Sequence, residues 1–170
     1  MDFATTAMSR AIAVEYRWAE GRYDRLPALA ADLVRRKVAV IVTQGTPAAF
    51  AAKQATTTIP IVMAVAGNPV DTGLVSSVAR PGGNITGSSF FYAEISAKRL
   101  EIMKELMPPL TRAGVLLNPD NPAMPSILRA MTQTAKAINV TLQSIDVRDL
   151  NELEPAIERV RSQVRCHCDS

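Results

Sequence analysis

The chain has 170 residues, of which 48% are hydrophobic and 21% charged, with a formal net charge of +3. This composition is typical of a globular protein with one domain or two small ones. The positive charges are scattered and no basic stripe with interleaved aromatic residues occurs, which argues against nucleic-acid binding. No apolar stretch reaches about 18 residues, so we expect no membrane span.

The two cysteines, Cys166 and Cys168, lie in the final CHCDS. With a single residue between them, a disulfide would be strained, so we expect none. Cys-His-Cys without a distant second pair of ligands does not match the spacing of zinc sites. We therefore interpret this end as a solvent-exposed tail and expect no metal site.

The spacing of apolar residues predicts strands that alternate with helices along the chain. Alternating or continuous apolar runs predict strands at 11–18, 38–42, 59–65, 85–89, 113–117 and 141–147. Helical spacing predicts helices at 26–36, 47–56, 74–79, 94–106, 124–138 and 151–164. Such an order predicts the α/β class, with parallel sheets flanked by helices and wound by right-handed crossovers.

Two segments repeat one pattern, in which an apolar strand leads through a short polar turn into a helix that begins at proline. Thr46 and Asn121 stand where an N-cap belongs, followed by Pro47 and Pro122 at the first helical position. Free backbone N–H groups at such helix starts attract anions and polar groups. Because ligands bind beyond the carboxyl ends of parallel strands, the two turns predict two half-sites that face a cleft.

Polar residues gather in the turns that would line this cleft. Asp71 and Asp120 are acids in these loops, although capping or solvation explains Asp120 equally well. The candidate ligand contacts are Gln44, Thr46, Asn68, Ser88, Ser89, Asn118, Asp120 and Asn121. Turns are rich in such residues in any protein, so turn chemistry and ligand binding explain this set about equally well.

Sequence motifs of catalysis are missing. GxGxxG and GxxxxGK[ST] do not occur, the glycine-rich turn at 82–84 precedes a strand rather than a helix, and no GxSxG exists. His167, the only histidine, lies in the tail. We therefore expect a binding protein without catalytic residues or a cofactor. Two alternatives stay open: a Rossmann-like enzyme acting on a small carboxylate, and a ligand-sensing regulatory domain, for which residues 1–10 are too short to hold a helix-turn-helix.

Motifs in a fixed order resemble those of ABC transporter substrate-binding proteins of the tryptophan/tyrosine type. The motifs are EYRWAEG, TPAA, IPIV, NPV, RPGGNITG and LNPDNP, and the resemblance covers roughly residues 14–156. It implies a two-lobed type I periplasmic-binding fold that closes on an amino acid or small carboxylate. It also implies delivery to an ABC permease and ATPase and a periplasmic location, although no export signal is visible, which leaves the cytoplasm as an alternative.

The same resemblance assigns ligand loops. It places Thr46 and Pro47 in the ligand loop of the first lobe, and Asn68 in a loop that commonly reads Asp-Pro, so that Asn68 removes a charge from the cleft. The remaining matches are Ser88 and Ser89 at the crossover, and Asn118, Asp120 and Asn121 in the ligand loop of the second lobe.

A change of composition at 88–94 predicts the boundary between the two lobes. We expect residues 1–89 to form the first lobe and residues 90–170 to form part of the second. Compared with the family, the chain is expected to be truncated at both ends, without the first strand-helix unit and with an incomplete second lobe. Exposed sheet edges and a loss of binding would follow from such a truncation.

Overall fold

Two separate parallel sheets form the framework of the molecule. The computed structural model describes residues 12–165, with side chains to residue 160. The first sheet has the order β1-β2-β3, and the second pairs β4 with β5. All the strand pairs are parallel, which confirms the predicted α/β class. The strands are β1 (Ile41–Gln44), β2 (Ile61–Ala66), β3 (Ile85–Ser89), β4 (Arg112–Leu117) and β5 (Thr141–Asp146).

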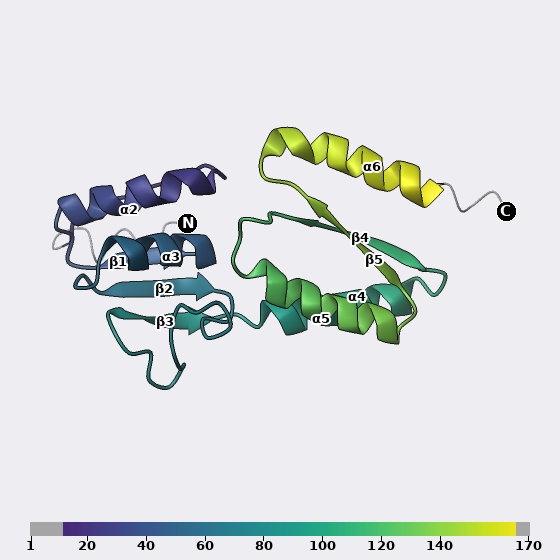
Figure 1. Ribbon diagram of the computed structural model, residues 1–170, viewed down its shortest axis with the longest axis horizontal. Helices are drawn as coiled ribbons and strands as arrows, with labels where there is room; N and C mark the ends of the chain where they lie inside the picture. The colour runs from purple at the N-terminus through teal and green to yellow at the C-terminus, as the bar shows by residue number, and fades with distance from the viewer. Residues whose placement is uncertain (1–11, 166–170) are drawn as a thin grey trace.

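Helices connect and cover these strands. They are α2 (Leu26–Arg35), α3 (Thr46–Ala55), α4 (Tyr92–Leu106), α5 (Met124–Ala137) and α6 (Leu153–Arg165), with the short 3-10 helices η1 (Tyr23–Arg25) and η2 (Leu150–Glu152). Figure 1 shows α2 and α3 on the same side of the first sheet, and the second sheet between α6 and the α4–α5 pair. Within the described residues, no helix has both the length and the apolar content needed to cross a bilayer.

The predicted strand at 11–18 is wrong for its described part, residues 12–18, while Ala11 lies outside the described residues. The apolar alternation is present, but a strand also needs a hydrogen-bonded neighbour, and the segment has none among the described residues. Its contact is with α2, because Arg17 donates two hydrogen bonds to Asp32, at 2.6 and 2.9 Å.

The predicted helix at 74–79 is also wrong, because this segment consists of bends and irregular chain. Leu74 and Val75 pack into the first core. The Lys53 ammonium on α3 donates hydrogen bonds to the carbonyls of Gly73 and Leu74, at 3.1 and 2.9 Å. These long-range contacts engage the side chains and carbonyls that a local helix would use, so tertiary packing overrides the helical spacing.

Each sheet has its own core. The first contains Ile41, Ala49, Ala52, Ile61, Met63, Ala66, Leu74, Val75 and Ile85, and the second contains Leu100, Ala135 and Val140. Alanines on α3 allow this helix to lie close to the first sheet. Gly87 on β3 allows a similar approach between strands, since a Cβ there would lie 2.2 Å from the Met63 carbonyl oxygen.

Candidate ligand site

The carboxyl ends of the two sheets meet at Gly67. This buried residue directly follows β2, Thr46 begins α3, and Ala123 immediately precedes α5. A Cβ placed on Gly67 would lie 2.9 Å from the Cβ of Ala123 and 3.3 Å from Oγ1 of Thr46. Loops from both halves of the molecule therefore converge at the end of the sheets where α/β proteins bind their ligands.

The starts of α3 and α5 differ from the predicted caps. Gly45, with φ of 86°, is the N-cap of α3, and Ala123 is the N-cap of α5, so the predicted caps Thr46 and Asn121 are wrong. Asn121 instead accepts a hydrogen bond from the N–H of Ala123, at 3.0 Å. This local turn occupies the carboxamide oxygen of Asn121 before the helix begins. Pro122, which was predicted at the first helical position, also lies before α5.

Thr46 joins α3 to the loop after β2. Its side chain is buried, and Oγ1 accepts a hydrogen bond from the Gly67 N–H at 3.0 Å. A buried N–H needs such a partner, because leaving it unpaired costs free energy. Thr46 therefore lies at the convergence of the two halves, as a residue that positions Gly67.

A small hollow lies beside this convergence. Its volume is about 10 Å³, the space of about one water molecule. Asn68 lines it and shapes its own loop, since Oδ1 of Asn68 accepts a hydrogen bond from the Val70 N–H at 3.1 Å. The lining comes from three segments: Gly67, Asn68 and Asp71; Phe90, Tyr92, Ala93 and Glu94; and Ala123, Ser126 and Ile127.

An aromatic pair lies where the chain passes from the first sheet to the second. The rings of Phe90 and Tyr92 stack with centroids 5.4 Å apart and an angle of 28° between their planes. Both side chains are exposed. Asp71 and Glu94 add two carboxylates to the same lining. The hollow thus combines an aromatic surface, carboxylates and the amide of Asn68, which is a suitable set for a small polar ligand with an apolar part.

Most of the predicted site residues lie away from this hollow. Asn68 lines it and Thr46 contacts Gly67, but the others are not in its lining. Ser88 donates to the Ala64 carbonyl at 3.1 Å, whereas Ser89 pairs with Ala66 in the sheet. Gln44 ends β1 with an exposed side chain, and Pro47 lies half-buried in the first turn of α3.

The loop after β4 is occupied with its own contacts. Oδ1 of Asn118 accepts from the Asp120 N–H at 2.9 Å, and its Nδ2 donates to the Arg148 carbonyl at 3.3 Å. The Asp120 carboxylate lies 3.7 Å from the Arg148 guanidinium. Asn118, Asp120 and Asn121 therefore shape this loop, which is the turn-chemistry explanation of these residues.

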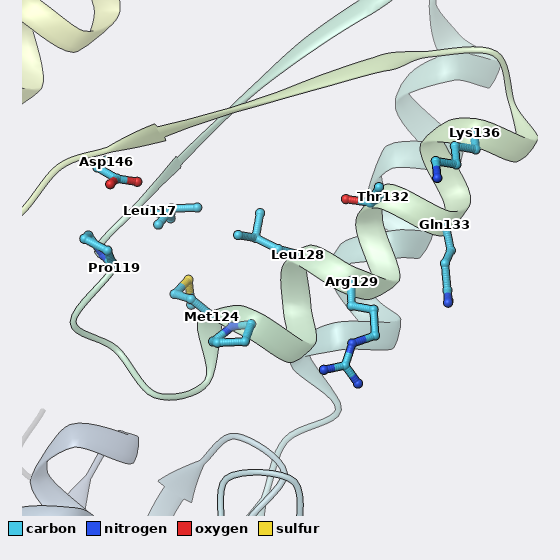
Figure 2. Close-up of a pocket in the computed structure, with 10 residues that line it drawn as sticks. Leu117, Pro119, Met124, Leu128, Arg129, Thr132, Gln133, Lys136 and Asp146 are labelled. Carbon is cyan, nitrogen blue, oxygen red and sulfur yellow. The ribbon is translucent and has the colours of Figure 1, made fainter.

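A larger pocket opens on the second half of the molecule, between α5 and the ends of β4 and β5 (Figure 2). Its volume is about 660 Å³, within the range of small-molecule sites. Leu117, Met124 and Leu128 supply apolar walls, and Asp146 lies at the strand end. No residue of the first sheet lines this pocket, so a ligand bound in it would not connect the two halves.

Four residues of the lining were not predicted from the sequence: Phe90, Tyr92, Glu94 and Ser126. The triplet Phe90-Phe91-Tyr92 was a usable signal, because aromatic residues make up only 5% of the chain. Ser126 carried no such signal, since its place in the lining depends on how α5 approaches the loop after β2.

Comparison with known proteins identifies the family of this chain. The family model described as ABC transporter substrate binding protein matches residues 7–168. A tyrosine-binding protein of Clostridioides difficile (strain R20291) is 30% identical over 153 residues, which cover 90% of this chain and 44% of that protein. The chain belongs to the ABC transporter substrate-binding protein family, a family of transport proteins rather than of enzymes, which confirms the resemblance.

Solved structures share the fold. A conserved domain protein from Vibrio cholerae has a TM-score of 0.82 at 26% identity, over 89% of this chain and 50% of that one. An ABC domain from Streptococcus pneumoniae, in complex with L-Trp, has a TM-score of 0.81 at 24% identity, over 89% and 52% of the two chains. The chain thus spans about half the length of these relatives.

Proposed function

We propose that this chain binds an amino acid or a small carboxylate between the loop after β2 and the start of α5, as the solute-binding component of an ABC importer. The observation that carries the proposal is the convergence of Thr46, Gly67 and Ala123. Family membership supports it, together with the tyrosine-binding relative and the fold shared with an L-Trp complex.

The polar groups around the hollow suit such a ligand. At the start of α5, Met124 and Ile127 donate their N–H groups to the carbonyls of Asn121 and Ala123, and Pro125 has none, so the Ser126 N–H is the backbone donor left for a carboxylate. Nδ2 of Asn68 has no hydrogen-bond partner among the described residues and can donate to the same group. The ring of Tyr92 offers an apolar face to the ligand side chain. Asp71 and Glu94 are the carboxylates available to a ligand ammonium group.

Binding would require the two halves to separate and close again. A hollow of about 10 Å³ cannot hold an amino acid. We propose that residues 1–89 and 90–170 act as two lobes, linked in this chain at Phe90 and Phe91. A ligand that contacts both lobes favours the closed arrangement by its differential affinity. No covalent bond is made or broken in this cycle.

The partners follow from the family. We propose that the loaded protein delivers its ligand to an ABC permease and its ATPase, and that it works in the periplasm. The match of the family model over residues 7–168 supports this assignment. The enzyme and the regulatory domain are not favoured by any of the relatives.

Isothermal titration calorimetry tests the binding proposal with L-tryptophan, L-tyrosine and benzoate as probes. We expect saturable heat with at least one of them. Asn68→Ala and Tyr92→Ala should each weaken this binding by about tenfold, the equivalent of about 1.4 kcal/mol. Arg129→Ala is the matched control, because Arg129 lines the larger pocket and does not line the hollow. Absence of heat with every probe, or an equal loss in the Arg129→Ala variant, would contradict the proposal.

A further inference from the structure

The loop after β2 is held at both of its ends by the same helix, α3. At the start of the loop, the Gly67 N–H donates a hydrogen bond to Oγ1 of Thr46, at 3.0 Å. At its far end, Nζ of Lys53 donates hydrogen bonds to the carbonyls of Gly73 and Leu74, at 3.1 and 2.9 Å. Thr46 begins α3 and Lys53 lies in its last turn, so the length of one helix sets the span of this loop.

Lys53 is the partner on which the far end of the loop depends. No backbone N–H of the described residues donates to the carbonyl of Gly73 or of Leu74. The Leu74 side chain is buried in the first core, and a carbonyl that loses its partner beside such a core costs free energy. Without the Lys53 ammonium, these two carbonyls would have to turn toward water, and the end of the loop would loosen.

The loop carries two residues of the hollow, Asn68 and Asp71. The Asp71 carboxylate makes no hydrogen bond or ion pair with the described residues, so the loop backbone determines where it lies. Backbone hydrogen bonds connect this part of the loop to its far end, because the Val75 N–H donates to the Pro69 carbonyl at 3.0 Å and the Thr72 N–H donates to the Asn68 carbonyl at 3.2 Å. A shift at the far end therefore reaches the lining.

We infer that Lys53 is a positioning residue of the ligand site. Its ammonium holds the far end of the loop against α3, so that Asn68 and Asp71 keep their places in the lining. Lys53 itself does not line the hollow, which means that its effect on a ligand passes through the loop. The inference rests on the proposed function for what is bound, whereas the contact between Lys53 and the loop belongs to the chain without a ligand.

Lys104 provides a matched control. Its Nζ donates hydrogen bonds to the carbonyls of Pro108 and Leu110, at 2.7 and 2.8 Å, after the end of α4. None of these three residues lines the hollow. Lys53→Met and Lys104→Met thus each remove an ammonium that bonds to two carbonyls, and both keep a side chain of similar length. Only the first should affect the site.

Hydrogen exchange measured by NMR without a ligand tests the contact itself. The N–H groups of Gly73 and Val75 donate to carbonyls within the loop, both at 3.0 Å. In Lys53→Met they should exchange about tenfold faster or more, because the loop opens more often. Lys104→Met should leave them unchanged, and protected amides in β2 show that each variant is folded. Unchanged exchange in Lys53→Met would overturn the inference, whether or not the chain binds a ligand.

Isothermal titration calorimetry with L-tyrosine and L-tryptophan tests the effect on the site. Lys53→Met should weaken binding by about tenfold, and Lys104→Met by less than about twofold. Equal affinity of Lys53→Met and the wild type would overturn the inference. A wild type that binds neither probe would contradict the proposed function alone, since hydrogen exchange decides separately whether Lys53 holds the loop.

A double-mutant cycle separates positioning from a general loss of stability. If Lys53 acts through the loop, Lys53→Met should weaken binding much less in an Asp71→Asn background than in the wild type, because both changes remove the same contact with the ligand. In a Tyr92→Ala background, on α4, the effect of Lys53→Met should remain about tenfold. Equal effects in the two backgrounds would mean that Lys53 supports only the fold, and would overturn the inference.

Discussion

At the scale of single residues, Thr46 shows how one hydroxyl connects distant parts of the chain. It begins α3, yet its oxygen accepts the N–H of Gly67, 21 residues away, at 3.0 Å. A Cβ placed on Gly67 would lie 3.3 Å from this hydroxyl oxygen and 2.9 Å from the Cβ of Ala123. The convergence at the candidate site therefore depends on a hydrogen bond that replaces the expected helix cap.

Thr46→Val should destabilise the protein by about 1–3 kcal/mol, because the buried Gly67 N–H then lacks an acceptor. Thr46→Ser keeps the oxygen and removes one methyl group, so we expect a smaller loss of about 1 kcal/mol. Urea denaturation of both variants measures the difference. A loss in Thr46→Ser that equals or exceeds the loss in Thr46→Val would mean that the methyl group contributes at least as much as the hydrogen bond at this position.

At the scale of elements, one carboxylate holds residues 12–18 against α2. Asp32 accepts hydrogen bonds from Arg17, Arg35 and Arg36, at 2.6–2.9 Å. The Arg17 hydrogen bond, followed by that of Arg36, lowers the pKa of Asp32 to about 2. The carboxylate therefore stays charged in the folded protein at a pH where a free aspartate takes up a proton.

Acid should release this segment. Because the folded pKa of Asp32 lies below the value of about 3.9 for a free aspartate, its stabilising contribution is full above about pH 5 and is lost as the pH falls from about 4 to about 2. Fluorescence anisotropy of Trp18 in dilute protein should fall over this range, and should already be low at neutral pH in Asp32→Asn. Asp24→Asn is the control, since Asp24 pairs with Arg22 instead. An unchanged anisotropy in Asp32→Asn would show that other contacts hold the segment.

At the scale of the whole molecule, the two halves have unequal cores. Among the described side chains, the buried cluster of the first half has nine members, whereas that of the second half has three, Leu100, Ala135 and Val140. Less buried apolar surface gives a lower free energy of local opening. The second half should therefore open more easily than the first.

Hydrogen exchange tests this inequality. Amides of β4 and β5 should exchange faster than those of β1 and β2. Leu100→Ala creates a cavity in the second core, at a cost of about 2–5 kcal/mol, so it should accelerate exchange in β4 and β5 while leaving β2 protected. A uniform acceleration of all strands would instead show that the molecule opens as a single unit.

The amino-acid pattern alone predicted most of the elements. Apolar runs such as Ile61–Ala66 and the helical spacing of α4 and α5 are local properties, so the parallel α/β class and the five long helices could be predicted from them. The motifs, in their fixed order, also led to the family that the comparisons confirm. For the candidate site, the sequence predicted the end of the sheets and the loop at Asn68.

The tertiary structure decided the rest. Whether residues 12–18 become a strand depends on a neighbouring strand, and the chain provides an ion pair with α2 in its place. Leu74 and Val75 leave their helical spacing because the first core buries them. The hollow joins Asn68, Tyr92 and Ser126 only after α5 approaches Gly67. Periodicity records which side of an element is apolar, whereas the partner that covers that side is set by contacts between residues far apart in the chain.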